Sequence, residues 1–164
     1  MSEPFQIVAG YPPGAVGQVV ALHGAYYGRE WRFAPQFECE VAAELAAFVS
    51  RLDPAREGLW LAVCGDEVGG SLAVQSEGGA ARIRWFITAS RLRGKGAGHA
   101  LLDAALGFCR ERGYGRVFLW TFAGLDAARH LYEAAGFRLV EEREDEAWGP
   151  RVVHQRFELV LTRG

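Results

Sequence analysis

Cysteines are few in this chain and lie far apart. Cys39, Cys64 and Cys109 are the only three in 164 residues, and none forms a CxxC pair or stands beside a histidine at metal-ligand spacing. A scattered, odd set is typical of reduced core thiols in a cytosolic protein, not of a disulfide framework or a zinc site. The sequence therefore predicts free buried thiols, no metal and a cytoplasmic location.

Long hydrophobic runs and an excess of one charge are also missing. No apolar run approaches the roughly 20 residues that cross a bilayer, and the first residues have neither the basic nor the apolar part of an export signal. The formal net charge is −2. No global field favours polyanions, so we expect neither nucleic acid nor a membrane as a partner.

Repeats, low-complexity tracts and Ser/Pro-rich linkers are absent as well. Half of the residues are hydrophobic, enough for one packed core, and we expect a single domain over residues 1–164. Hydrophobic periodicity predicts a strand, two helices, three strands, a helix, a strand, a helix and two strands. That order is typical of mixed α/β or α+β folds.

The expected elements are short and separated by Gly, Pro and Asp. Within the third strand of the central meander, Ile83, Trp85 and Ile87 alternate with Arg82, Arg84 and Phe86, so the first three are expected to share one face. The expected helices cover 16–27, 41–52, 100–112 and 126–135, and the expected strands cover 5–9, 59–64, 68–74, 81–88, 117–122, 137–141 and 152–161.

A glycine-rich loop, Arg93-Gly94-Lys95-Gly96-Ala97-Gly98, lies between an expected strand and an expected helix. Glycines allow a tight turn and bring backbone N–H groups close to a ligand, and the helix start adds unpaired donors and a positive dipole end. Arg93 and Lys95 add charge. The loop therefore predicts a phosphate or pyrophosphate site.

Two common nucleotide-binding loops do not fit these residues. A Walker A loop requires Gly-Lys followed by Ser or Thr, which this chain does not contain. A dinucleotide fingerprint requires glycine where His99 stands, and an acidic residue at the end of the next strand, where the chain has Trp120-Thr121-Phe122. A dinucleotide-dependent enzyme is therefore a weak alternative.

The loop resembles the R/Q-x-x-G-x-G/A pyrophosphate loop of the GCN5-related N-acetyltransferases, the GNAT family. The segment Ala128 to Phe137 is similar to the downstream A-x-x-L-Y-x-x-x-G-F motif of that family. The whole chain can be laid on the family's fold. The resemblance implies a central, mostly antiparallel, twisted sheet with a parallel central pair splayed at the cofactor site, flanked by helices.

The resemblance also implies acetyl-CoA as co-substrate. The strand before the loop would offer backbone N–H groups to the thioester and pantetheine, and the loop would hold the pyrophosphate. The residues implied are Phe86, Ile87, Thr88, Arg93, Gly94, Lys95, Gly96, Ala97, Gly98 and His99.

Tyr132 is the candidate general acid. A phenol with a pKa of about 10 is protonated at neutral pH and can donate to a leaving thiolate. On pattern alone Tyr132 is equally a core aromatic of a helix face, and the family motif favours the catalytic role.

A general base cannot be read from the sequence. Glu30, Glu38 and His23 lie in the region that usually lines the acceptor side, and each is more simply a solvated or capping residue. The acceptor is expected to meet an aromatic-rich pocket with few charges, which favours a small amine with an apolar part. The residues expected there are Tyr27, Trp31, Trp148 and Gln155.

Several short segments resemble acetyltransferase domains that bacteria fuse behind a MarR-type winged helix: Trp120-Thr121-Phe122, Ala127 to Tyr132 and Trp148-Gly149. The few residues before Phe5 leave no room for a recognition helix, so no specific DNA binding is expected. One departure from the family is Leu125, where Asn is frequent.

Two functions from different classes follow. The first is an N-acetyltransferase that moves the acetyl group of acetyl-CoA to a primary amine of a small or amino-acid-like molecule, with Tyr132 as general acid. The alternative is a non-catalytic acyl-CoA-binding sensor or interaction module derived from a MarR–GNAT regulator. A homodimer is left open by either interpretation.

Overall fold

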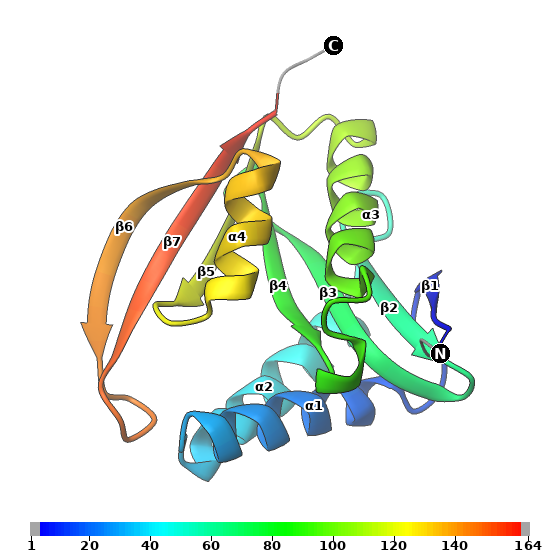
Figure 1. Cartoon of the computed structure of the whole chain (residues 1–164). Coiled ribbons are helices and arrows are strands. Elements are labelled where there is room, and N and C mark those ends of the chain that lie inside the picture. The colour runs from blue at the N-terminus through cyan, green and yellow to red at the C-terminus, as the bar shows by residue number, and fades with distance from the viewer. Residues whose placement is uncertain (1–3, 162–164) are drawn as a thin grey trace.

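The structure is a computed structural model, and it describes residues 4–161. One seven-stranded sheet runs through it in the order β1-β2-β3-β4-β5-β7-β6 (Figure 1). All neighbours are antiparallel except β4 and β5, which are parallel. The strands are β1 (Gln6–Ala9), β2 (Gly58–Cys64), β3 (Glu67–Glu77), β4 (Ala80–Thr88), β5 (Arg116–Phe122), β6 (Arg138–Asp145) and β7 (Val152–Val160). The expected mixed fold with a parallel central pair is confirmed.

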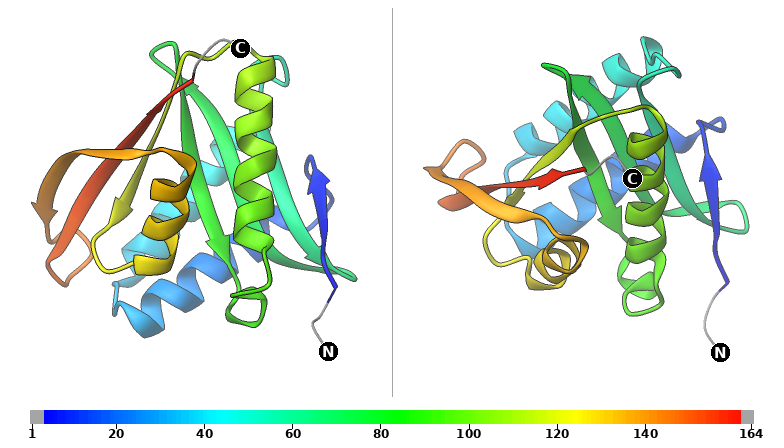
Figure 2. Two further views of the ribbon diagram at one scale, coloured as in Figure 1. Left: turned by 45° about the horizontal axis from the view of Figure 1, so that its top comes forward. Right: turned by 90° about the horizontal axis from the view of Figure 1, so that it is seen from above.

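Helices cover both faces of the sheet (Figure 2). α1 (Ala15–Glu30) and α2 (Pro35–Ser50) lie on one face, and α3 (Ala97–Glu111) and α4 (Asp126–Ala135) lie on the other, with a short 3₁₀ turn, η1 (Ser90–Leu92), before the glycine loop. Gly113 and Gly136, which follow α3 and α4, have φ of 78° and 103°. Such left-handed positions end helices and favour glycine, as the sequence predicted.

Two apolar cores result, one on each face. The α3/α4-side core is built around fully buried Leu72, Leu101 and Phe157, and the α1/α2-side core around Leu45 and Leu61. Because both faces are covered, the central strands are apolar on both sides.

Strand β4 departs from the expected alternation. Ile83 lies in the α3/α4-side core, but Trp85 lies in the α1/α2-side core and Phe86 packs on the opposite side again. The cause is a bulge, because the register with β3 slips between Ser71 and Ala73 and Trp85 has φ of 48°. The expectation that Ile83 and Trp85 share a face was wrong, since one extra residue inverts the parity of everything after it.

The bulge carries a strained residue that its surroundings hold in place. A positive φ is rare for a bulky side chain and costs on the order of 1–3 kcal/mol. The buried Ser71 hydroxyl donates a hydrogen bond of 2.6 Å to the Trp85 carbonyl oxygen. Strain retained in this way is commonly found at functional sites.

Beyond the bulge, β4 and β5 separate. Their pairing covers only Ala81–Val117, Arg82–Phe118 and Ile83–Leu119, although both strands continue further (Figure 1). The β4 edge from Trp85 to Thr88 therefore faces an opening, and its backbone groups can pair with a ligand.

One cysteine is not where the sequence placed it. Cys64 and Cys109 are buried, and burial raises the pKa of the Cys109 thiol to about 12, but Cys39 is exposed. The buried stripe of α2 is Phe37, Val41, Leu45 and Phe48. Cys39 lies two residues beyond Phe37, on the solvent side of the helix, so the prediction of three core thiols was wrong for Cys39.

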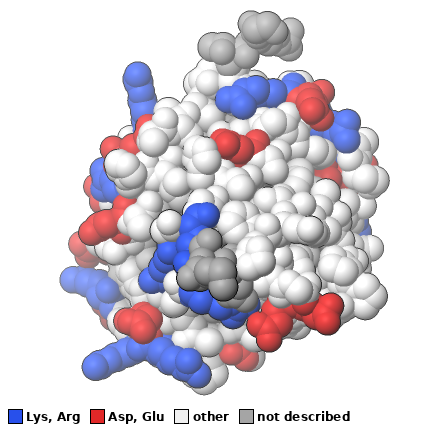
Figure 3. All heavy atoms as spheres, turned by 45° about the vertical axis from the view of Figure 1, so that its right-hand side comes forward, with Lys and Arg blue, Asp and Glu red and all other residues white. Residues whose placement is uncertain are grey.

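Charges of both signs are interspersed on the face seen in Figure 3, around a broad uncharged area. This mixture agrees with the formal net charge of −2. Within residues 4–161 no helix has the length and apolar character needed to cross a membrane.

Candidate active site

A cleft of about 1260 Å³ passes through the opening between β4 and β5. Its walls come from both faces of the sheet, because the opening connects them. On the α3/α4 side it is lined by the glycine loop and α4, and on the α1/α2 side by α1, α2 and the β6–β7 loop. One continuous space can thus admit a long ligand from one face and a second molecule from the other.

The glycine loop has the backbone shape that its sequence predicted. Gly94 and Gly96 have φ of 74° and 86°, and Gly96 is the N-cap of α3. At Gly98 a Cβ would lie 3.1 Å from Leu131 Cδ1, a tight contact, so glycine favours the close approach of the start of α3 to α4. The first amides of α3 lack intrahelical acceptors and point outward at a positive dipole end. This arrangement fits a pyrophosphate.

The structure gathers most of the expected cofactor residues along this cleft. Lys95 is the exception: its side chain is exposed and it is not part of the cleft wall. The expected cofactor residues that line the cleft are Phe86, Ile87, Thr88, Arg93, Gly94, Gly96, Ala97, Gly98 and His99.

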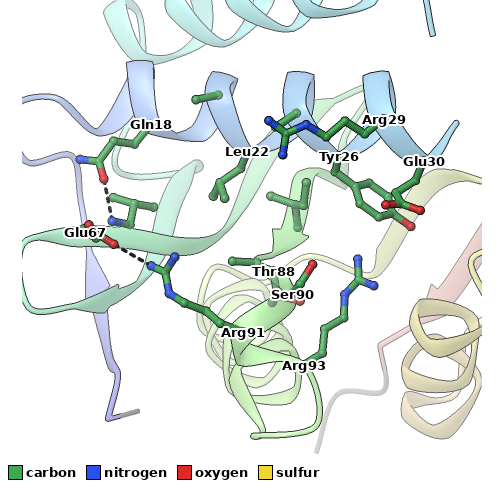
Figure 4. Close-up of a pocket in the computed structure, with 15 residues that line it drawn as sticks. Gln18, Leu22, Tyr26, Arg29, Glu30, Glu67, Thr88, Ser90, Arg91 and Arg93 are labelled. Atoms are coloured by element: carbon green, nitrogen blue, oxygen red, sulfur yellow. Dashed lines mark hydrogen bonds and ion pairs between the residues drawn. The ribbon is translucent and has the colours of Figure 1, made fainter. Parts of the chain in front are cut away.

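The Arg93 side chain lies against α1. Its guanidinium lies 4.9 Å from the centre of the Tyr26 ring, and Figure 4 shows it beneath Tyr26 and Glu30. This contact separates the cleft from a second hollow of about 420 Å³, where Arg91 pairs with Glu67 at 3.1 Å. Both hollows are lined by Tyr26 and Arg93, so the second is a side chamber of the first.

Tyr132 lines the cleft from α4 and is 4% exposed. Its ring packs against Phe86, Phe137 and Phe157, with centroids about 6 Å apart. Burial raises the pKa of its phenol above the usual value, which keeps it protonated at neutral pH. The hydroxyl has no hydrogen-bond partner within residues 4–161, so its proton is free to serve a ligand in the cleft.

Tyr27 approaches the same space from the opposite face. Burial raises the pKa of its phenol, and Tyr132 and Arg93 both act on it electrostatically. Tyr132 comes from α4 and Arg93 from the loop, so the two tyrosines are within electrostatic reach through the opening. Tyr27 also contacts Phe122 of β5, at 5.7 Å between ring centres.

The other expected acceptor residues divide between the cleft and its surroundings. Trp148 lines the cleft, and its indole Nε1 donates to Glu40 Oε2 at 2.9 Å, which ties the β6–β7 loop to α2. Trp31 packs against Tyr27 and Phe122, behind the wall.

Gln155 is outside the cleft lining. It is buried, and its amide donates to Glu142 at 3.2 Å. Side chains alternate along a strand, so its neighbour His154 is the residue of β7 that lines the cleft. The expectation for Gln155 had the wrong parity on this strand.

The three base candidates also occupy different places. Glu30 borders the side chamber, and the carboxylate of Glu38 packs so closely on Gly24 of α1 that a Cβ there would collide with it. His23 is buried in the cleft wall, and its Nδ1 lies 2.8 Å from the Val19 carbonyl oxygen. A carbonyl only accepts, so Nδ1 carries the proton and Nε2 presents a lone pair.

The burial of His23 predicts acid sensitivity. Burial lowers the pKa of His23 to about 4 from 6.5, so the unfolded chain binds the extra proton first as pH falls. Its contribution to stability is complete above pH 6.5 and is lost as pH falls toward 4, by about 3 kcal/mol. The free energy of unfolding, measured with urea, should differ less between pH 7 and pH 4.5 for His23→Gln than for the wild type. An equal loss of stability between the two pH values in both proteins would contradict the prediction for His23.

The chain belongs to the acetyltransferase (GNAT) family, whose model matches residues 18–137. This is a family of acyltransferases. The fold agrees: an acetyltransferase from Streptococcus agalactiae superimposes with a TM-score of 0.74 over 96% of this chain and 98% of that chain, at 19% identity.

Two relatives have greater sequence similarity. An N-acetylaspartate synthetase of Danio rerio is 32% identical over 129 residues, and one of Rattus norvegicus is 33% identical over 116 residues. These regions cover 77% and 69% of this chain, but only 46% and 38% of the relatives. The chain thus spans less than half the length of either one.

Proposed function

We propose that residues 1–164 form one N-acetyltransferase domain that transfers the acetyl group of acetyl-CoA to a primary amine of a small, amino-acid-like molecule. The observation that carries this proposal is the cleft through the sheet, with the glycine loop and Tyr132 on one face and a pocket closed by Trp148 on the other. The two parts of the cleft, one on each face of the sheet, meet at the unpaired edge of β4. This arrangement suits a reaction between two substrates.

Acetyl-CoA would enter as a substrate from the α3/α4 face. The amides at Gly96, Ala97 and Gly98 would hold its pyrophosphate, and the free edge of β4 from Phe86 to Thr88 would pair with the pantetheine as a strand does. The thioester would then lie in the opening, near the Tyr132 hydroxyl.

The acceptor would approach from the α1/α2 face. Aromatic rings of Tyr27, Phe122 and Trp148 supply an apolar wall, and Arg143 adds a cation to it. The synthetases to which the chain is similar are named for the acetylation of an amino acid, and an amino acid offers an amine and a carboxylate to such a wall.

The chemistry would be a direct transfer. The amine nitrogen attacks the thioester carbon, the N–C bond forms, and the C–S bond breaks. Tyr132 gives its proton to the departing thiolate, and burial keeps the phenol protonated at neutral pH until that step. Backbone N–H groups at the β4 edge stabilise the carbonyl oxygen as it gains charge.

The similarity to MarR-fused domains, a homodimer and a cytoplasmic location stay predictions. Leu125 stands at the N-cap of α4, with no side-chain hydrogen bond. Together with the lack of a carboxylate on β4 from Arg82 to Phe86, it keeps a non-catalytic acyl-CoA sensor as the alternative.

The test is release of free thiol from acetyl-CoA across a panel of amines that includes L-aspartate, other amino acids and simple alkylamines. We expect release that depends on the amine, with an acetylated product of matching mass. Binding of acetyl-CoA with no release for any amine would favour the sensor instead.

Arg93→Ala should weaken the binding of acetyl-CoA without slowing the chemical step. A charge-assisted contact to phosphate contributes about 1.5–3 kcal/mol, and the exposure of Arg93 favours the lower end, or roughly a tenfold rise in KM for acetyl-CoA. Arg91→Ala, nearby and paired with Glu67, is the control and should leave that constant unchanged. A fall in kcat with an unchanged KM would assign Arg93 another role.

A further inference from the structure

His154 is a histidine of the acceptor wall that the chemistry above does not use. It lies on β7 directly opposite Phe122 of β5 and lines the cleft. Its ring is 5.1 Å from that of Phe122 and 5.5 Å from that of Trp148. Only 13% of the side chain is exposed.

The two ring nitrogens of His154 are in different environments. Nε2 is buried, has no hydrogen-bond partner, and lies 3.6 Å from Oδ2 of Asp145 on β6. A carboxylate at that side favours the tautomer with the proton on Nε2. The lone pair is then on Nδ1, which has no hydrogen-bond partner within residues 4–161.

The placement separates this imidazole from Tyr132. Tyr132 belongs to the α3/α4-side core, whereas Phe122 and Trp148, which enclose His154, pack on the α1/α2-side core. The two groups therefore face the opening from opposite faces. This division suits a transfer reaction in which one group takes a proton from the amine and another gives a proton to the thiolate.

Other groups near the acceptor are committed elsewhere. Glu40 accepts from the Trp148 indole, and Glu44 is ion-paired with Arg84. His23 lines the cleft, but within residues 4–161 its hydrogen bond is to the Val19 carbonyl oxygen and not to a carboxylate. The charged groups that face His154 are Asp145 and Arg143 of β6, with Glu40 of α2 beyond Trp148.

Building on the proposed function, we propose that His154, positioned by Asp145, is the general base that takes the proton from the acceptor amine. As the N–C bond forms, the amine nitrogen loses one proton to Nδ1, and the thiolate gains one from Tyr132. The products are the amide and free coenzyme A. Exchange with water then removes the proton from His154 and returns one to Tyr132.

The charge state agrees with this role. Burial lowers the pKa of His154, so the imidazole is neutral at pH 7 and able to accept a proton. Asp145 acts in the opposite direction and Arg143 in the same direction as burial. Removal of each neighbour therefore shifts the pKa of His154 in a known direction.

The experiment measures kcat against pH, at saturating acetyl-CoA and the best amine of the panel, for His154→Gln, Asp145→Asn and Arg143→Gln. We expect His154→Gln to lower kcat by about 10²–10⁴-fold with unchanged acetyl-CoA binding. The acidic limb of the profile should move to lower pH in Asp145→Asn and to higher pH in Arg143→Gln. NMR titration of His154 in both variants should shift in the same directions.

Full kcat in a folded His154→Gln protein, or an acidic limb that moves with neither neighbour, would overturn the proposal. So would a loss of activity confined to His23→Gln. If His154→Gln does not fold, the two variants at the more exposed Asp145 and Arg143 decide the matter alone. A wild-type protein that binds acetyl-CoA and releases no thiol would instead refute the proposed function, and the base with it.

Discussion

Replacing Tyr132 with phenylalanine is expected to lower kcat by about 10²–10⁴-fold and to leave acetyl-CoA affinity and the melting temperature nearly unchanged. The substitution keeps the ring that packs on Phe86 and Phe157 and removes only the hydroxyl. That hydroxyl has no hydrogen-bond partner within residues 4–161, so its loss leaves no buried acceptor unsatisfied. The effect should appear in the chemical step alone, measured by stopped-flow thiol release at saturating substrates.

Tyr114→Phe is the matched control. Tyr114 is also a buried tyrosine, but its hydroxyl donates to the Arg56 carbonyl oxygen at 2.6 Å, far from the cleft. Its removal should lower the free energy of unfolding by about 0.5–1.5 kcal/mol and leave kcat unchanged. A loss of kcat in Tyr132→Phe and a loss of stability in Tyr114→Phe would show that the first hydroxyl acts in the reaction and the second stabilises the fold.

Full turnover in the Tyr132→Phe protein would identify Tyr132 as a core aromatic, the alternative that its helix position allowed. Lost stability with a proportionate loss of activity would make it a packing residue. Either result would direct the search for the acid toward Tyr27, the other phenol at the opening.

Local patterns of the sequence predicted most of the fold. The helix expected over 126–135 matches α4, and the glycines after α3 and α4 end them as predicted. Such features depend on residues within one or two turns of each other. The glycine loop belongs to the same class, since its φ angles follow from its own composition.

The parts that failed depend on pairing between distant segments. The bulge at Trp85 results from the register with β3, and nothing within β4 itself shows it. The choice between His154 and Gln155 is a question of parity, which the pairing with β5 decides. A shift of one residue exchanges the two faces of a strand, so the prediction placed Gln155 in the acceptor wall instead of His154.

His154 was therefore missed although the sequence contains a signal for it. It shares a face with Val152 and Arg156 on a strand that pairs with β5, opposite the apolar run that ends at Phe122. Asp145 stands nine positions earlier, across a turn that contains Gly149 and Pro150. A β-hairpin closed by that turn places Asp145 and His154 on neighbouring strands, so the turn residues and the spacing are enough to predict that they lie close together.

The second large effect is expected for Gly96→Val at the start of α3, where acetyl-CoA affinity should fall by about 100-fold or more. Gly96 has φ of 86°, and the amides beside it are those that would hold the pyrophosphate. A β-branched side chain is strained at this φ, by about 1–3 kcal/mol, and tends to rotate the amides away. Two lost charge-assisted bonds of about 1.5 kcal/mol each correspond to the expected weakening.

Gly79→Val in the β3–β4 turn controls for the strain. Gly79 has φ of 82° and open space around a Cβ, as Gly96 does, but it lies at the opposite end of β4 from the loop. Both variants should lose similar stability in thermal unfolding, because they share the same backbone strain. Only Gly96→Val should lose affinity in calorimetric titration with acetyl-CoA. Equal affinity in the two proteins would mean that the loop does not hold the pyrophosphate, since the strain would then be the only consequence of the substitution.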